Sequence, residues 1–250
     1  MLAKLRPLDA EVDAEAEAAG LEERFGHLDA RDLIALSIGR FRPGSLAAVS
    51  SFGADSAVLL HMLARIDPTL PVLFLETGKH FNETLQYRDA LVADFGLRDL
   101  RIVAPRPELL AVRDPDGTLH QRDTEACCDV RKVEPMARAV APFDAWFTGR
   151  KRHQAATRAG LPVFEAVGER IRINPMAKWT TADLAAYMRE HRLRENPLVA
   201  YGYLSIGCFP CTQPVKAGDD PRAGRWAGQA KTECGIHLSG LDDSLTASSL

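Results

Sequence analysis

Five cysteines stand out among the 250 residues as side chains that could bind a metal or act as nucleophiles. Cys127 and Cys128 are adjacent, and Cys208 and Cys211 form a later C-x-x-C motif. Four thiolates in two pairs are what a tetrahedral zinc ion or an iron–sulfur cluster requires. Neighbouring side chains diverge, which suits the separate corners of a cluster better than one zinc ion. Unrelated buried thiols are the alternative.

The fifth cysteine, Cys234, lies in the polar segment KTECGIHL. Four basic side chains are near it in sequence: Arg222, Arg225, Lys231 and His237. Because cations lower the pKa of a thiol and increase its reactivity, this setting favours an exposed nucleophile. An incidental exposed thiol is the plainer reading.

Two further segments could bind an anion. The loop SSFGADS at residues 50–56 lies between a predicted strand and a predicted helix, where backbone N–H groups and the helix dipole can hold a phosphate. It lacks the lysine of a Walker loop and the three glycines of a dinucleotide fingerprint. A turn capped by Asp55 and Ser56 explains it equally well. The basic run TGRKRHQ at residues 148–154 also ends a predicted strand.

A predicted helix over residues 124–133 would carry two cations beside the first cysteine pair. Arg131 and Lys132 each follow a cysteine by four residues, so they lie one turn along the same face. Solvated surface cations are the default interpretation, more so for Arg131 than for Lys132. Pro135 cannot donate a hydrogen bond to the carbonyl of Arg131, which predicts a kink or an end there.

Alternating strands and helices must position these residues. Residues 8–40 have helical spacing; strand, loop and helix then follow one another from residue 46, again from residue 71, and more weakly from residue 101. Residues 143–149 read as a buried strand and residues 171–176 as an exposed or edge strand ended by Pro175. Thr180 and Asp183 have the spacing of a capping box.

This alternation predicts an α/β fold with a mostly parallel sheet and helices on both faces. Ligands of such sheets bind beyond the carboxyl ends of the strands, so the loops at residues 50–56, 76–81 and 148–152 should meet in one pocket. We expect residues 1–45 to form a helical segment, residues 46–212 the α/β domain, and residues 213–250 a mobile C-terminal segment.

Composition limits the function classes. With 46% apolar and 26% charged residues and a net charge of −3, the chain has the make-up of a globular protein without general attraction to nucleic acid or anionic lipid. It has no apolar run of the roughly 20 residues that cross a bilayer, and its first residues lack the apolar centre of a secretion signal. We therefore expect a cytoplasmic protein with reduced thiols.

The motifs together match one known family. SSFGADSAVLLHML, FLETGKHFNETLQYRD, CCDVRKVEPM, TGRKRHQ, NPMAKWT, GCFPC, RAGRW and ECGIHL, between about residue 46 and residue 238, resemble assimilatory adenylyl-sulfate reductases, the cluster-bearing relatives of phosphoadenylyl-sulfate reductases. The resemblance implies a Rossmann-like fold of the adenine nucleotide alpha hydrolase type. It also implies that Cys234 attacks the sulfur of adenylyl sulfate, that AMP leaves, and that a dithiol releases sulfite from the S-sulfocysteine.

The resemblance further assigns residues to roles. It implies nucleotide contacts by Ser51, Phe52, Gly53, Ser56, Glu76, Thr77 and Gly78; phosphosulfate contacts by Lys132, Arg150, Arg222 and Arg225; and a four-iron four-sulfur (4Fe-4S) cluster on Cys127, Cys128, Cys208 and Cys211. Glu76 stands where aspartate is more usual in the family. We expect the cluster to act electrostatically and structurally by orienting Lys132.

The implied partner is thioredoxin or a glutaredoxin-like reductant, with no nucleic acid and no membrane, and the sequence leaves a homo-oligomer open. Reduction of phosphoadenylyl sulfate is the nearest alternative. Cluster-containing tRNA thiolation enzymes share the nucleotide loop, but Phe52 and Ala54 depart from their Gly-Gly-Lys pattern and Cys234 would lack a role. A zinc-stabilised nucleotide-binding module is the non-enzymatic alternative.

Overall fold

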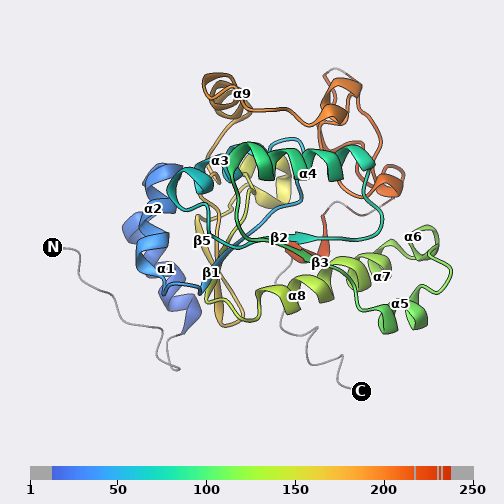
Figure 1. Ribbon diagram of the computed structural model, residues 1–250, viewed down its shortest axis with the longest axis horizontal. Helices are drawn as coiled ribbons and strands as arrows, with labels where there is room; N and C mark the ends of the chain where they lie inside the picture. The colour runs from blue at the N-terminus through green and yellow to red at the C-terminus, as the bar shows by residue number, and fades with distance from the viewer. Residues whose placement is uncertain (1–12, 217, 230, 232, 238–250) are drawn as a thin grey trace.

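A six-stranded sheet forms the centre of the computed structural model, which describes residues 13–216, 218–229, 231 and 233–237 (Figure 1). The strands are β1 (Leu46–Val49), β2 (Val72–Leu75), β3 (Leu100–Val103), β4 (Ala145–Phe147), β5 (Phe164–Val167) and β6 (Arg170–Ile173). Their order is β3-β2-β1-β4-β6-β5, and all neighbours are parallel except β5 and β6. The predicted α/β class is confirmed.

Helices cover both faces of the sheet. The α-helices are α1 (Ala14–Phe25), α2 (Ala30–Arg40), α3 (Ser56–Ile66), α4 (Asn82–Phe95), α5 (Pro107–Arg113), α6 (Leu119–Arg122), α7 (Thr124–Cys128), α8 (Glu134–Val140) and α9 (Thr181–Glu190). Figure 1 shows α3 and α4 on one side of the strands and α8 on the other. The predicted capping box at Thr180 and Asp183 begins α9.

Strand residues alternate between two apolar cores. Ala48 and Phe147 belong to a large core shared with α2, α3, α4 and α9, whereas Ala47 and Trp146 belong to a smaller core shared with α8. This alternation follows from the two-residue period of a strand, and burial on both faces explains why β1, β2 and β4 are apolar throughout. The cores fix the sheet from which the functional loops extend.

The strand order places a ligand site between β1 and β4. From β1 the chain moves outward to β2 and β3, and then returns to place β4 on the other side of β1. The loops that leave the carboxyl ends of β1 and β4 therefore diverge, which opens a crevice at the switch point of the sheet. Residues 50–56 and 148–151 are those two loops.

The expectation of an exposed or edge strand at residues 171–176 is wrong. β6 ends at Ile173, lies between β4 and β5, and is buried at Arg172 and Ile173. The edge is occupied by β5, joined to β6 by a two-residue turn in which Gly168 has φ +55°. The prediction rested on Pro175, which lies beyond the end of the strand, and the charge of Arg172 inside the strand is neutralised by Glu165 directly opposite on β5.

The helical stretch that carries the first cysteine pair continues past Pro135. A π-helical turn, Asp129–Val133, joins α7 to α8, and the N–H of Glu134 donates to the carbonyl of Asp129. Pro135, which has no N–H to donate, follows directly as the second residue of α8. A local π turn thus replaces the predicted kink.

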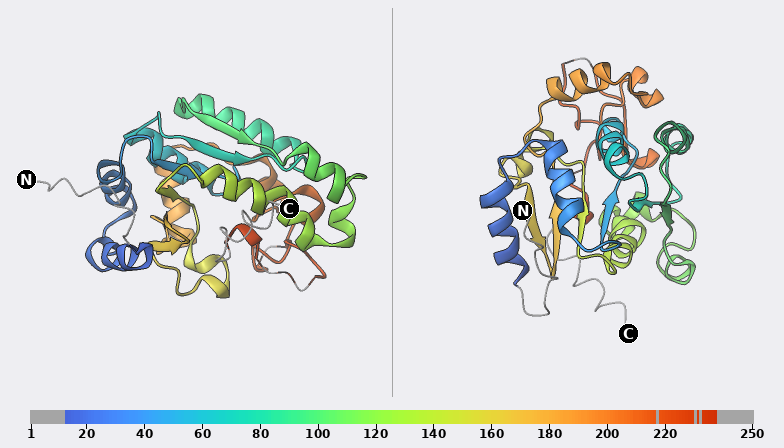
Figure 2. Two further views of the ribbon diagram at one scale, coloured as in Figure 1. Left: turned by 90° about the horizontal axis from the view of Figure 1, so that it is seen from below. Right: turned by 60° about the vertical axis from the view of Figure 1, so that its left-hand side comes forward.

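The N-terminal helices pack against the sheet. Leu21 of α1 and Leu33 of α2 lie in the large core, and Figure 2 shows α1 beside the edge of the sheet formed by β5. Near the C-terminus, Thr212 pairs with Arg225 in an antiparallel bridge. Within the described ranges, no helix has the length and apolar content needed to cross a membrane. The expectation for the last residues, 239–250, lies outside the described residues.

Candidate functional site

A cavity of about 1070 Å³ lies at the switch point between β1 and β4. Two of the predicted loops supply much of its wall: Ser50, Ser51, Gly53 and Ser56 come from the first, and Thr148 through Lys151 from the second. From the loop after β2, His80 reaches the cavity. The far side is formed by α9 and by residues 204–207 and 220–226. Two of the three predicted loops therefore meet in this cavity, and the third contributes His80 to it.

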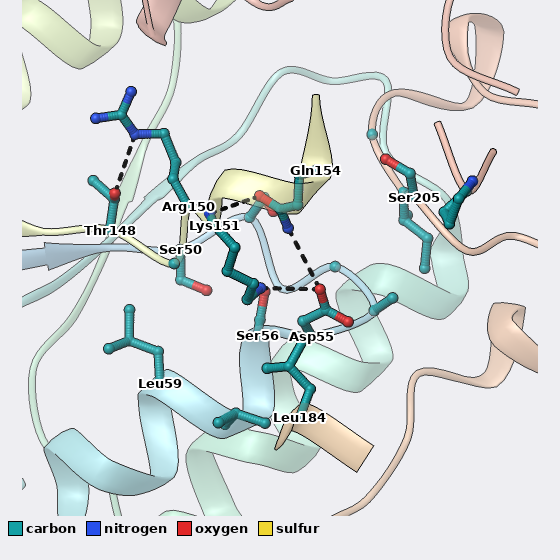
Figure 3. Close-up of a pocket in the computed structure, with 18 of the residues that line it drawn as sticks. Ser50, Asp55, Ser56, Leu59, Thr148, Arg150, Lys151, Gln154, Leu184 and Ser205 are labelled. Carbon is teal, nitrogen blue, oxygen red and sulfur yellow. Dashed lines mark hydrogen bonds and ion pairs between the residues drawn. The ribbon is translucent and has the colours of Figure 1, made fainter. Parts of the chain in front are cut away.

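Asp55 and Lys151 lie where the loop at residues 50–56 meets α3. The ammonium of Lys151, whose side chain is 2% exposed, lies 3.0 Å from the Asp55 carboxylate, as Figure 3 shows. Asp55 precedes α3 but makes no side-chain cap to it, because its carboxylate faces Lys151 and Gln154. Burial lowers the pKa of Lys151, and Asp55 opposes this effect.

Clustered arginines give the cavity a positive wall. Arg150 and Arg172 are buried, both contact Glu165, and both line the cavity. Burial lowers the pKa of Arg150, and the positive charges of Arg172 and Arg158 lower it further. A bound anion would relieve this repulsion, so the wall favours a negatively charged ligand.

The segment RAGRW brings Arg222 and Arg225 to the same cavity. The guanidinium of Arg225 lies over the Trp226 ring, 4.4 Å from its centroid, and against Gly207, where a side chain would collide with it. Among the described residues, the buried Arg225 Nε and Trp226 Nε1 donors have no hydrogen-bond partner. Buried donors of this kind require an acceptor, which an anionic ligand would supply.

Cys234 lies inside the cavity rather than on the surface. It is 6% exposed, so the expectation of an exposed thiol is wrong. The π turn and the short helical turn Gly235–His237 hold it, and an added Cβ at Gly235 would lie 2.8 Å from Val133 Cγ2. The neighbouring Cys128 thiol lowers the pKa of Cys234, burial opposes this effect, and the positive charges of Lys132 and Arg225 lower the pKa further. These two cations favour the thiolate form of Cys234.

The other four cysteines line one small neighbouring cavity: Cys127, Cys128, Cys208 and Cys211. Burial raises the pKa of Cys127 and of Cys211, and the proximity of Cys208 raises both further. Among the described residues, no group of three or more histidine, cysteine or carboxylate side chains is arranged to hold a single metal ion. The two cysteine pairs, far apart in sequence, thus line the same small cavity.

Lys132 lines both cavities. Burial lowers its pKa, but the nearby Cys208, Cys234 and Cys128 raise it to a net value above the ordinary one. The ammonium therefore stays charged between the cysteine cavity and the main cavity. Arg131, expected to be solvated, is instead buried and donates to the Asp114 carboxylate and the carbonyl of Thr77.

Some residues assigned by resemblance lie away from the main cavity. Phe52 is fully buried with φ +49°, and its ring packs edge-on against Phe74. It shapes the nucleotide loop from the core side. Thr77 contacts Cys208 at 3.4 Å, and Glu76 accepts the N–H of Gly78. This loop therefore borders the cysteine cavity, and of its members His80 faces the main one.

Three functional candidates were missed by sequence reasoning. Arg158, Arg172 and Glu233 all line the main cavity and are buried or nearly so. Arg158 and Arg172 have no motif that separates them from surface arginines. Glu233 is the acid immediately before Cys234, which was a usable signal.

Comparisons with known proteins agree with this architecture. Residues 45–214 match the family described as the phosphoadenosine phosphosulfate reductase domain. A protein of Mesorhizobium japonicum named adenosine 5'-phosphosulfate reductase is 69% identical over 254 residues, covering 100% of both chains. One of the same name from a Chelativorans species is 66% identical and covers 97% of this chain and 98% of its own.

A solved structure is also similar. Phosphoadenylyl-sulfate reductase from Candida auris, in a phosphate complex, has a TM-score of 0.69 and 26% identity, covering 82% of this chain and 98% of its own.

Proposed function

Because the chain belongs to the phosphoadenosine phosphosulfate reductase family, we propose that it reduces adenylyl sulfate to sulfite and AMP. The 69% identical relative named for the unphosphorylated nucleotide favours adenylyl sulfate as the substrate. The proposed setting is assimilatory sulfate reduction and cysteine biosynthesis in the cytoplasm.

In the proposed reaction the Cys234 thiolate attacks the sulfur of adenylyl sulfate. A sulfur–sulfur bond forms, the bond from sulfur to the phosphate oxygen breaks, and AMP leaves as an anion. One thiolate of thioredoxin or a glutaredoxin-like protein then attacks Cys234 Sγ and releases sulfite. The second thiol of that protein resolves the mixed disulfide, so the dithiol supplies both electrons and Cys234 is restored.

The observation that carries the proposal is a buried thiol that shares one cavity with four cationic side chains. Cys234, Lys132, Arg150, Arg222 and Arg225 all line it. A thiolate approaches a doubly anionic phosphosulfate only when the negative charges are offset, and these cations are in place before the substrate arrives. The unpartnered donors of Arg225 and Trp226 suit the oxygens of such a substrate.

We further propose that Cys127, Cys128, Cys208 and Cys211 hold a 4Fe-4S cluster. Four thiols around one cavity fit its donor set, and the raised pKa values of Cys127 and Cys211 mean that bound metal must compensate their ionisation. When bound, the cluster would supply local charge and hold two distant segments together. Lys132 and Arg131 would then offset the negative charge of the thiolates.

The test is to trap the covalent intermediate. Incubation with ³⁵S-labelled adenylyl sulfate and no reductant should label the peptide that contains Cys234, with release of one AMP per label. Cys234→Ser should bind AMP like the wild type and acquire no label. Label on another peptide, or none with the wild type, would overturn the proposed chemistry.

Parallel measurements separate the alternatives. Comparing sulfite release from adenylyl sulfate and phosphoadenylyl sulfate decides the nucleotide preference. Iron content and visible absorption of anaerobically purified protein distinguish a cluster from the zinc in a colourless nucleotide-binding module. Consumption of ATP with tRNA modification would favour the tRNA thiolation enzyme instead.

A further inference from the structure

Glu233, the residue before the proposed nucleophile, is held by a two-pronged ion pair. Its Oε2 accepts from Arg158 Nε at 2.7 Å and its Oε1 from Arg158 Nη2 at 2.8 Å. The two side chains are 11% and 7% exposed, so the pair is largely removed from solvent. Arg222 Nη2 also donates to Oε1, at 3.2 Å. Paired N–H donors fix both distance and orientation, which a single contact does not.

The same carboxylate fixes the backbone at Cys234. Glu233 Oε1 accepts the N–H of Cys234 at 3.0 Å. The position of the Cys234 Cα atom therefore depends on where the Glu233 carboxylate is anchored, and that anchor is Arg158.

Arg158 is in turn tied to the nucleotide loop. Its Nη1 donates to Gln154 Oε1 at 2.6 Å, and that oxygen also accepts the N–H of Lys151 at 3.1 Å. Gln154 Nε2 donates to Asp55 at 3.5 Å, and Figure 3 shows Gln154 and Lys151 converging on Asp55. A polar chain thus connects the backbone of Cys234 to the start of α3.

We propose that Glu233 and Arg158 form a latch that seats Cys234 in the main cavity and registers it against the nucleotide loop. Both are positioning residues, since they act through the backbone of Cys234. The role in turnover rests on the proposed function, whereas the seating of the thiol does not.

Glu233 could instead occupy the place of a substrate anion and leave when the substrate binds. The contacts favour the latch. Arg158 is directed to Glu233 and Gln154, while Arg150 and Arg225 remain on the cavity wall for a ligand. Departure of Glu233 would also remove the hydrogen bond that fixes Cys234. Although burial raises it, the pKa of Glu233 is held below its ordinary value by Arg158 and Arg222, so the carboxylate is ionised at neutral pH.

The first measurement needs no substrate. In the purified holoprotein, the limiting rate of alkylation by iodoacetamide is measured at high pH, where a change in the pKa of the thiol does not affect the rate. Peptide mass spectrometry shows that the alkylated residue is Cys234. Glu233→Gln should raise this rate about tenfold, because loss of the buried ion pair lets the segment that carries Cys234 leave the cavity more often and exposes the thiol to the reagent. Glu125→Gln is the matched control: Glu125 pairs with Lys231, in the same tail, but is exposed.

The second measurement is turnover. Glu233→Gln should lower kcat about 10- to 100-fold while the Kd for AMP stays within about twofold, since misplaced reacting groups lose rate rather than nucleotide affinity. Arg158→Gln should match it. Arg158→Lys keeps the positive charge but cannot make the paired hydrogen bonds, so it should recover part of the rate. This partial recovery would show that the loss of rate in Arg158→Gln does not come from misfolding.

Three outcomes would overturn the latch. They are an unchanged alkylation rate in Glu233→Gln, an equal increase in Glu125→Gln, and tighter substrate binding with faster sulfo transfer in Glu233→Gln; the last would make Glu233 a placeholder for the substrate anion. If the wild type forms no sulfo adduct, the proposed function fails, but the alkylation comparison still decides whether the latch exists.

Discussion

Lys132 lines both the main cavity and the cysteine cavity, so its positive charge acts on both. Lys132→Met keeps the aliphatic stem and removes the ammonium, so formation of the sulfo adduct should slow about 100-fold while the thermal midpoint changes little. Rapid-quench measurement of labelled Cys234 tests this. Lys79→Met is the control, because Lys79 borders the cysteine cavity alone. Equal losses in both variants would contradict a specific role for Lys132.

Gly207 is needed because of the side chain that crosses it. A Cβ at this position would collide with the Arg225 guanidinium, which is the movable end of a flexible side chain. Gly207→Ala should therefore displace Arg225, raise KM about tenfold by weakening one charge-assisted hydrogen bond, and leave the fold intact. Steady-state kinetics and circular dichroism measure the two effects.

The control for Gly207 is Gly39→Ala in α2, where an added Cβ meets nothing within 4 Å. It should leave KM unchanged. A KM for Gly207→Ala equal to that of the wild type would show that Arg225 binds no substrate oxygen.

Residue types and spacing pointed to many residues of the site but not to the buried ion pairs among them. The cysteine pairs were identifiable from their residue type and spacing, and the arginines of RAGRW from their nearness to Cys234 and from the family resemblance. Arg158 was not, because its function depends on Glu233, which lies far away in sequence and reaches it by tertiary folding alone. Cys234 was expected to be exposed, since sequence polarity does not show that a polar segment folds into a cavity.

At the scale of elements, one ion pair joins the two strands of the β5–β6 hairpin, between the buried Arg172 and the partly buried Glu165. Glu165 accepts from Arg172 Nε at 2.8 Å and also contacts Arg150. Glu165→Gln leaves both cations without their buried counter-charge and should lower the free energy of unfolding by about 3 kcal/mol. Urea denaturation followed by tryptophan fluorescence measures it.

Asp144→Asn provides the comparison for that variant. Asp144 pairs with Arg42, whose side chain is 59% exposed, so its loss should cost less than about 1 kcal/mol. If the two variants are equally stable, the charges on the hairpin contribute little and its apolar residues hold it in place.

Element prediction succeeded where apolar periodicity was clean and failed where charge was buried. β1, β2 and β4 were found because strands covered on both faces are apolar throughout. β6 was misplaced at an edge because Pro175 follows it, but the strand ends before Pro175, and its buried Arg172 is neutralised by Glu165 from a strand that was not predicted. The π turn at residues 129–133 was not predicted, because Pro135 indicated only a kink or an end of the helix.

At the scale of the whole molecule, stability should fall on mild acidification. Burial lowers the pKa of His61, and the charges of His191 and Arg65 lower it further; its Nδ1 lies 2.9 Å from the Tyr187 hydroxyl between α3 and α9. Burial also lowers the pKa of His80. In the unfolded chain these histidines take up protons as the pH falls through their ordinary pKa of 6.5, whereas in the folded chain they stay neutral to lower pH. The free energy of unfolding therefore decreases as the pH falls through 6.5.

The measurement is urea denaturation at several pH values from about 7.5 to about 5.5. His61→Phe keeps a ring between Phe95 and Tyr187 and removes the titrating group, so its stability should depend less steeply on pH than that of the wild type. Equal slopes would mean that other groups cause the acid sensitivity.

The seat of Cys234 on the π turn also has a consequence for biosynthesis. Gly235 lies against Val133, and Cys234 follows every strand of the sheet in the chain. During translation, the strands and the helical stretch that form this seat leave the ribosome before the reactive thiol does. When Cys234 leaves the ribosome, most of the cavity that buries it is consequently already folded. This limits the time in which the thiol could react with other nascent sulfhydryls.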